Sequence, residues 1–116
     1  MSERDPDVAL RHMLDAARRA LEIARPLTRE QLDADRVETL ALTRLVEVLG
    51  EAARRVPEVV RAAHAQIPWR QITGTRDRLI HGYDQVDLDI LWTIVRDRLP
   101  LLVQQLDAAL RGPSEP

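Results

Sequence analysis

The sequence predicts an all-α protein, folded as a single-domain bundle of about five helices. Aromatic residues make up 3% of the chain and phenylalanine is absent, whereas alanine and leucine are abundant. This composition favours helix over strand. Apolar residues recur every three or four positions over long stretches, and prolines divide these stretches into segments of helical length. At 116 residues, the chain is long enough to bury a hydrophobic core in one domain.

The first two helices are predicted over residues 7–24 and 35–56. Pro26 follows the first helix and ends it, and Thr28 and Asp35 are candidate N-caps on either side of a short connector. The second helix carries the wider apolar stripe, as expected of the most enclosed helix of a bundle. Gly50 lies inside it at a cost of about 1 kcal/mol relative to alanine, so we expect other backbone to approach closely there.

Two shorter helices are predicted next. Pro57 starts a helix that reaches about residue 65, and Ile67 is extended because a proline follows it. Pro68 suits the first turn of another helix, which is predicted to run to His81 with Gly82 as its C-terminal cap.

The last helix is predicted to begin after Asp87, which is a candidate N-cap. Pro100 falls inside this helix and should kink it. We expect the helical domain to span residues 1–110 and residues 111–116 to form a disordered tail.

Composition limits the function classes. There is no cysteine, which excludes disulfides and zinc–thiolate sites, and every basic residue is arginine, which excludes lysine chemistry. The net charge of -2 argues against a broad surface for duplex nucleic acid but permits a local phosphate pocket. No apolar run approaches the roughly 20 residues that span a bilayer, and the N-terminus has no hydrophobic signal core. We expect a cytoplasmic protein with no membrane association.

The segment "RDRLIHGYD", residues 76–84, holds the candidate chemistry. On a helix, Asp77 and His81 share a face, and both this carboxylate and the helix C-terminus favour a protonated imidazole. Arg76 and His81 lie about 140° apart on an ideal helix, so a two-fold dimer is one way to bring them together. Two histidines beside guanidinium groups suffice for RNA cleavage without a metal.

From residue types alone, a charged helix end with no chemical role is the simpler interpretation of this segment. His12 and His64 are solitary and are expected to be solvated, and Arg96 and Arg98 are expected on a solvated face. No histidine pair has ligand spacing, so we expect neither a metal nor a cofactor.

Residues 67–92, "IPWRQITGTRDRLIHGYDQVDLDILW", together with "GEAARRVP" at 50–57, resemble the HepT-like branch of the HEPN superfamily. The hallmark of this branch is Arg, four residues, His, one residue and Tyr, matched here by Arg76, His81 and Tyr83. The resemblance implies an all-α homodimer with Arg76 and His81 of both chains in a metal-independent ribonuclease centre. Asp77 fills the usual polar position after the arginine, although many relatives carry asparagine there.

The resemblance further implies a toxin–antitoxin pair. The partner would be a minimal nucleotidyltransferase antitoxin, which in similar systems transfers AMP to the tyrosine of the motif, here Tyr83. Glu51 is a candidate carboxylate partner for Arg76, with a plain solvated carboxylate as the alternative. The competing hypothesis is a non-catalytic helical partner or regulatory subunit of a nucleotidyltransferase, which the acidic net charge favours.

Overall fold

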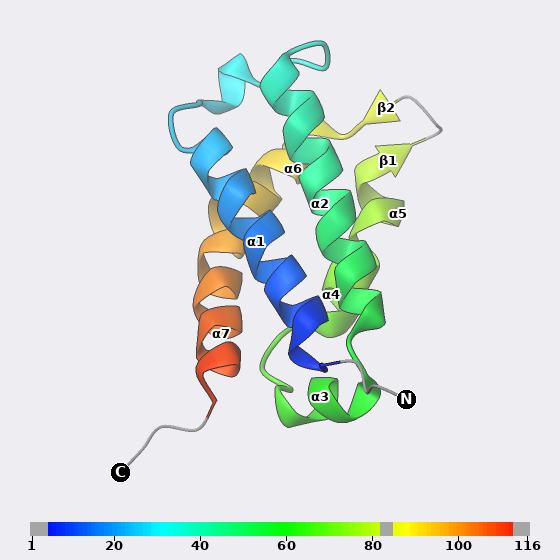
Figure 1. The fold of residues 1–116 in the computed structure, drawn as a ribbon. Coiled ribbons are helices and arrows are strands. Elements are labelled where there is room, and N and C mark those ends of the chain that lie inside the picture. Colours follow the sequence, from blue (N-terminus) through cyan, green and yellow to red (C-terminus); the bar gives the residue numbers. More distant parts are fainter. Residues whose placement is uncertain (1–4, 82–84, 113–116) are drawn as a thin grey trace.

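The computed structural model describes residues 5–81 and 85–112, and these form one helical domain (Figure 1). The all-α, single-domain prediction is confirmed. The elements in chain order are α1 (Asp7–Ala24), a 3-10 turn η1 (Arg29–Gln31), α2 (Val37–Arg55), α3 (Glu58–Ala63), α4 (Trp69–Thr73), α5 (Thr75–Leu79), β1 (Ile80–His81), β2 (Gln85–Val86), α6 (Leu88–Thr93), a π-helical segment η2 (Ile94–Arg98) and α7 (Leu99–Arg111).

The long helices α1 and α2 lie side by side and form the scaffold of the bundle (Figure 1). α7 packs on α1, while α4 and α5 pack on α2, so the later elements cover both sides of the scaffold. Each long helix buries one stripe of apolar residues, as the sequence periodicity predicts. The fully buried residues with the largest side chains are Leu10, Met13, Leu42, Ile67, Leu79, Leu91, Leu99 and Leu106.

The first helix has the predicted bounds, but the second begins later than predicted. Asp35 is not its N-cap, because Arg36 precedes the first helical residue, Val37. The backbone N–H of Asp35 instead donates to the Asp33 carboxylate at 3.2 Å, and the Arg36 N–H donates to the Asp33 carbonyl at 3.0 Å. These bonds hold residues 33–36 in a turn, so the helix starts only after it. Thr28 does precede a helical turn, η1.

The predicted close approach at Gly50 is confirmed. A Cβ at this position would lie 3.3 Å from the carbonyl oxygen of Ile72 in α4. That spacing is tighter than an ordinary contact, so glycine lets the α4 backbone pack directly on α2. The position of α4, and of α5 after it, therefore depends on the absence of a side chain in the middle of α2.

The prediction of one helix from Pro68 to His81 is wrong. It breaks at Gly74 into α4 and α5, and α5 ends at Leu79. Ile80 is extended, with φ -109° and ψ 117°, and pairs with Val86 across a short antiparallel ladder. The Asp87 N–H also donates to the Leu79 carbonyl at 2.8 Å, which extends this pairing. The strand pairing satisfies backbone groups that a longer helix would have used. Gly82, the predicted cap, lies outside the described residues.

The last helix is continuous but not regular. Asp87 caps it as predicted, since its carboxylate accepts from the Ile90 N–H at 3.0 Å. A kink was predicted at Pro100, and the structure has the π-helical turn η2 immediately before α7. Because proline has no N–H, the usual helical bond to Arg96 cannot form, and the backbone widens its spacing there. α7 extends to Arg111, and residues 113–116 of the predicted tail lie outside the described residues.

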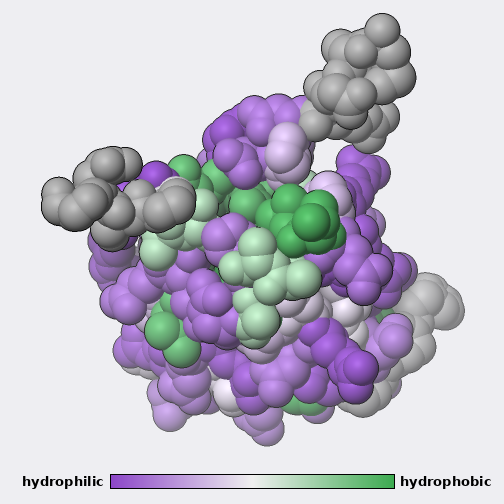
Figure 2. All heavy atoms as spheres, turned by 90° about the horizontal axis from the view of Figure 1, so that it is seen from below, coloured by the Kyte–Doolittle hydropathy of each residue, from purple (hydrophilic) through white to green (hydrophobic). Residues whose placement is uncertain are grey.

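Most of the described surface is hydrophilic. Viewed from the end of the molecule at which α3 lies, hydrophobic side chains gather in one area (Figure 2). Val59 of α3 is 76% exposed, and Val8 near the start of α1 is 40% exposed. None of the described helices is both long and apolar enough to cross a bilayer.

Candidate functional site

Arg76 lies on the surface of α5 and faces α2. Its Nε is 3.5 Å from Oε2 of Glu47, and its side chain is 67% exposed, whereas that of Glu47 is 20% exposed. Glu47 also approaches Arg44, one turn earlier on α2, at 3.9 Å. The largely buried carboxylate therefore lies between two guanidinium groups, and Arg76 keeps most of its N–H donors in solvent.

The carboxylate partner of Arg76 is thus one helical turn away from the one considered in the sequence analysis. Glu51 and Glu47 share a face of α2, but α5 packs so that Arg76 reaches Glu47. Glu51 is exposed. Sequence spacing identified the correct face of α2, whereas the register of α5 along that face depends on the packing at Gly50.

Asp77 and His81 are related differently from the way the sequence suggested. The expected effects of the Asp77 carboxylate and of the helix C-terminus on His81 both required a helix that continues to residue 81. The helix α5 ends at Leu79 instead. Asp77 is exposed on α5, and the backbone of His81 belongs to β1, opposite Gln85. The helical spacing and the helix dipole therefore do not apply to this pair. The structure describes no side-chain position for His81, and Tyr83 lies outside the described residues.

Hydrogen bonds within α4 and α5, and from two other elements, hold the segment that carries Arg76. The break at Gly74 exposes carbonyl groups at the end of α4, and side chains satisfy them. The Gln71 carbonyl accepts from Thr75 Oγ1 at 2.7 Å and from Arg78 Nη2 at 3.1 Å. Arg54 of α2 donates to the Thr73 carbonyl at 3.1 Å. These bonds fix the start of α5 and therefore the position of Arg76.

Arg98 of η2, which was expected on a solvated face, completes this set of contacts. Its Nη1 donates to the Gln71 side-chain oxygen at 2.8 Å. In the sequence, Arg98 reads as one more charge on a solvated face. Pro100 could have indicated the contact of Arg98, because a helix is often distorted in the turn before a proline and its side chains then leave their regular positions.

The helix that carries Glu47 also has two exposed apolar side chains. Val37 is 77% exposed and Leu40 is 58% exposed, and both lie at the start of α2. Leu40, Arg44 and Glu47 follow Val37 by three, seven and ten positions, which is the spacing of one helix face. Large apolar side chains at such exposure on a continuous face are typical of surfaces that bind another protein.

Metal-ligating side chains are not grouped in the described part of the chain. Within residues 5–81 and 85–112, no three histidine, aspartate or glutamate side chains lie close enough together to hold an ion.

Comparison with known proteins gives the family. Residues 13–109 match the family model described as "Ribonuclease HepT-like". The chain belongs to this family. The resemblance inferred from residues 67–92 is therefore confirmed, and the matched region includes every element from the middle of α1 to nearly the end of α7.

Relatives match over most of this chain. A protein named "Putative RNase" from Caldanaerobacter subterraneus subsp. tengcongensis is 33% identical over 106 residues, which cover 91% of this chain and 95% of the relative. One named "Probable ribonuclease HepT" from Thermococcus cleftensis is 36% identical over 81 residues, covering 70% and 74%. A third, named "Putative RNase", from Methanocaldococcus jannaschii is 28% identical over 107 residues, covering 92% and 98%. No solved structure gives a significant match.

Proposed function

We propose that the chain is a metal-independent endoribonuclease and the toxin component of a toxin–antitoxin pair. Its site is formed in a homodimer by Arg76 and His81 of both protomers. The observation that carries this proposal is the family match over residues 13–109, which includes the Arg76–His81 segment. The exposed position of Arg76, with one carboxylate contact and free N–H donors, supports it.

The chemistry requires two proton transfers and one charge stabilisation. One His81 takes the proton of the RNA 2′-hydroxyl, whose oxygen then attacks the adjacent phosphorus. The other His81 gives a proton to the departing 5′-oxygen, and Arg76 stabilises the negative charge on the phosphorus intermediate. The P–O5′ bond breaks as the P–O2′ bond forms, so the products are a 2′,3′-cyclic phosphate and a 5′-hydroxyl. Asp77 beside Arg76 supports the site from the surface of α5.

The dimer would use the exposed face of α2. Val37 and Leu40 lie on this face, and Arg76 contacts it through Glu47. Pairing of two such faces would bury apolar side chains and bring the Arg76–Glu47 pairs of the two protomers toward each other. One protomer by itself then has only half of the required groups.

The antitoxin in this proposal is a minimal nucleotidyltransferase that transfers AMP to Tyr83. The motif places Tyr83 two residues after His81. A nucleotide at this position would add negative charge and bulk next to the imidazole, so it would both repel RNA and obstruct its approach.

Cleavage of RNA in EDTA by the purified chain tests the catalytic assignment. Wild-type protein is expected to cleave and to leave 2′,3′-cyclic phosphate ends. His81→Ala is expected to remove cleavage, while the matched control His12→Ala, at an exposed position of α1, retains it. Equal cleavage by wild-type and His81→Ala protein would reject the assignment.

A mixing experiment tests whether the site is shared between protomers. Arg76→Ala and His81→Ala are each expected to be inactive alone. A dimer of one wild-type and one His81→Ala chain keeps a single His81, which cannot act as both base and acid, so we expect an excess of His81→Ala protein to inactivate the wild-type chain. Unchanged cleavage per wild-type chain in the mixture, with heterodimers verified by native mass spectrometry, would reject a pooled site.

Mass spectrometry after incubation with ATP and the proposed nucleotidyltransferase antitoxin tests the transfer of AMP to Tyr83. We expect the mass of one AMP on wild-type chain and none on Tyr83→Phe. If Tyr83 is modified but the unmodified dimer never cleaves RNA, the alternative applies, and the chain is a non-catalytic regulatory partner.

A further inference from the structure

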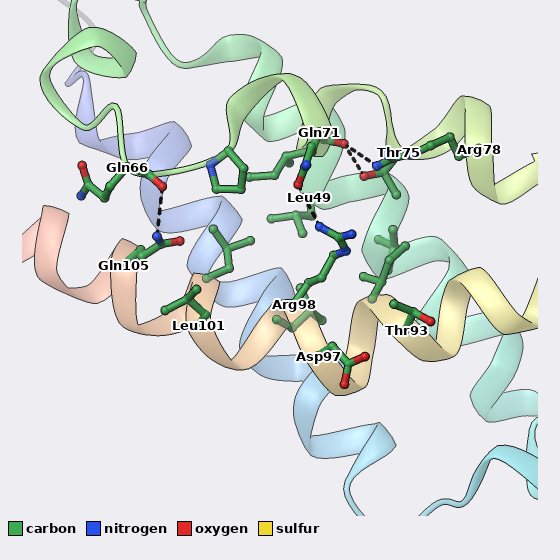
Figure 3. Close-up of a pocket in the computed structure, with 16 residues that line it drawn as sticks. Leu49, Gln66, Gln71, Thr75, Arg78, Thr93, Asp97, Arg98, Leu101 and Gln105 are labelled. Atoms are coloured by element: carbon green, nitrogen blue, oxygen red, sulfur yellow. Dashed lines mark hydrogen bonds between the residues drawn. The ribbon is translucent and has the colours of Figure 1, made fainter.

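A groove of about 450 Å³ separates α4 and α5 from η2 and α7 (Figure 3). Its floor is apolar and consists of core residues: Leu49, Ile72, Ile94 and Leu102. Arg76 and Arg78 are two residues apart in α5, so their side chains leave the helix about 200° apart. The groove is lined by Arg78 and not by Arg76, and it is therefore separate from the proposed catalytic centre.

Two arginines enter the groove without a carboxylate partner. Arg78 donates to the Gln71 carbonyl at 3.1 Å, and Arg98 donates to the Gln71 side-chain oxygen at 2.8 Å (Figure 3). Both acceptors are neutral. Within the described ranges, neither guanidinium forms an ion pair, although 19 acidic residues are present in the chain. A guanidinium has five N–H donors, so both groups retain donors and full charge for an anion.

The acidic residues near the groove do not neutralise these arginines. Asp97 lines the groove, but its carboxylate points away from Arg98 (Figure 3). Asp89 forms its ion pair with Arg29, at 2.6 Å. The rest of the polar rim consists of neutral side chains, including Gln105, whose amide N–H donates to the Gln66 carbonyl at 3.0 Å.

A second hollow of about 230 Å³ continues the groove past the arginines. Arg78, Thr93, Ile94 and Arg98 line both spaces, so the two guanidinium groups lie where the spaces adjoin. A ligand that fits both would place an apolar, planar body on the buried floor and negative charge beside the arginines. A nucleotide has a planar base at one end and a negatively charged phosphate at the other. The volume of this groove is within the usual range for small-molecule ligands.

We infer that this groove binds one nucleotide of single-stranded RNA, with its base on the apolar floor and its phosphate between Arg78 and Arg98. This rests on the proposed ribonuclease function, since it gives the substrate a second contact surface on the far side of α5. Charge complementarity favours RNA as the occupant, because the chain leaves two guanidinium groups unneutralised above an apolar floor. The site selects an unpaired strand, since a base must leave its stack to reach the floor.

Binding of a fluorescein-labelled single-stranded 2′-O-methyl oligoribonucleotide to the full chain, followed by anisotropy, tests this inference. The probe lacks the attacking hydroxyl, so binding is measured without cleavage. Arg78→Gln/Arg98→Gln is expected to weaken binding by about tenfold or more and to lower its salt dependence. The matched control Arg70→Gln/Arg96→Gln removes the same charge from exposed positions of α4 and η2 outside the groove, and should bind as wild type.

A second substitution avoids the hydrogen bonds to Gln71. Thr93 is exposed and lines both spaces, so Thr93→Glu adds a negative charge beside the arginines without altering the core. We expect Thr93→Glu to weaken binding, while Thr93→Gln, of similar size but neutral, retains it. Circular dichroism of each variant checks that the fold is intact.

The outcomes separate this inference from the proposed function. Wild-type affinity in both Arg78→Gln/Arg98→Gln and Thr93→Glu overturns the inference even if the chain cleaves RNA. Loss of binding to a fluorescein-labelled polyglutamate peptide in these variants, with RNA binding unchanged, overturns it in favour of an acidic protein partner. Groove-dependent RNA binding by a chain that never cleaves RNA supports the groove and rejects the ribonuclease proposal.

Discussion

The scaffold formed by α1 and α2 and the segment from α4 to η2 are built in opposite ways. The scaffold has two uninterrupted helices of 18 and 19 residues, whose interior backbone groups bond within their own helix. Residues 69–98 contain three helices of five or six residues, a two-stranded ladder and a π-helical turn. The proposed catalytic arginine and the two groove arginines, Arg78 and Arg98, belong to this interrupted segment.

The difference shows how side chains replace backbone pairing where helices break. The carbonyls of Gln71 and Thr73 accept from arginine side chains, Arg78 and Arg54. Such bonds to charged donors are stronger than neutral ones and are directional. They hold the interrupted segment in one geometry, and they also bring guanidinium groups to the surface near it. The breaks therefore concentrate cationic groups in the part of the fold that would contact RNA.

The largest expected effect comes from breaking the scaffold. Leu42 of α2 is fully buried, so Leu42→Ala is expected to lower the free energy of unfolding by about 2–5 kcal/mol, as thermal or urea denaturation would measure. Leu40→Ala, two residues away and 58% exposed, is the matched control and should change stability little. In our proposal, Leu40→Ala instead weakens dimerisation. Equal destabilisation by both substitutions would contradict the assignment of the α2 faces.

A smaller effect is expected where the two regions meet. Gly50→Leu would place a side chain against the Ile72 carbonyl, which lies 3.3 Å from a Cβ at this position. We expect a loss of about 1–3 kcal/mol in stability, because α4 must move away from α2. We also expect RNA cleavage to fall by more than the loss of folded protein explains, since α5 and Arg76 move with α4. Glu51→Leu, at an exposed neighbouring position, is the control, and an equal loss of cleavage in it would argue against a displacement of α4.

Where α2 of the scaffold meets α5, Glu47→Gln removes the carboxylate that positions Arg76. Because Arg76 is two-thirds exposed, stability should change by less than about 1 kcal/mol. Cleavage is expected to fall severalfold through a lower kcat, with KM for RNA little changed, if Arg76 acts on the phosphorus intermediate. Glu51→Gln tests the partner suggested by sequence spacing and should leave both constants unaltered. The opposite ranking of the two variants would show that Glu51 is the partner in the dimer.

The smallest effect concerns the start of the scaffold. A hydrogen bond from its own backbone N–H and the Arg36 guanidinium hold the pKa of Glu38 below its ordinary value. A lowered pKa in the folded state adds stability above the ordinary pKa of glutamate, and this stability is lost as the pH falls. Glu38→Gln should therefore lower the melting temperature slightly at about pH 7 and have no effect near pH 3. An equal difference at both pH values would exclude this linkage, and Glu22→Gln on α1 is the control.

The helices of the scaffold could be predicted from the sequence because their periodicity and their boundary residues are local features. The periodicity of residues 7–24 predicted α1 with its observed bounds, and Gly50 correctly indicated a close backbone approach. Asp35 was misassigned as a cap because Asp33 competes for the same backbone groups in a turn. The periodicity of α1 and the turn at Asp33 involve residues within a few positions of one another, where local preferences act directly, whereas Gly50 meets Ile72 of a later helix.

The interrupted segment could be predicted only in part. Asp87 was identified as a cap, but a helix through His81 was expected and is not formed. Instead, Ile80 pairs with Val86, six positions later, and this ladder replaces the last turn of the expected helix. The contact of Arg98 with Gln71 spans 27 positions, and the partner of Arg76 is 29 positions away, so neither follows from spacing.

The sequence by itself determined the helical class, the α1–α2 scaffold, the caps at Thr28 and Asp87, and the family, because each depends on local periodicity or on a contiguous motif. The tertiary structure decided that Glu47 rather than Glu51 meets Arg76, that α5 stops at Leu79, and that Arg78 and Arg98 converge on Gln71. The physical reason is that the contacts of Arg76 with Glu47 and of Arg98 with Gln71 join elements distant in the chain. Their register is set by close packing of whole helices, and by the backbone groups that this packing leaves to be satisfied.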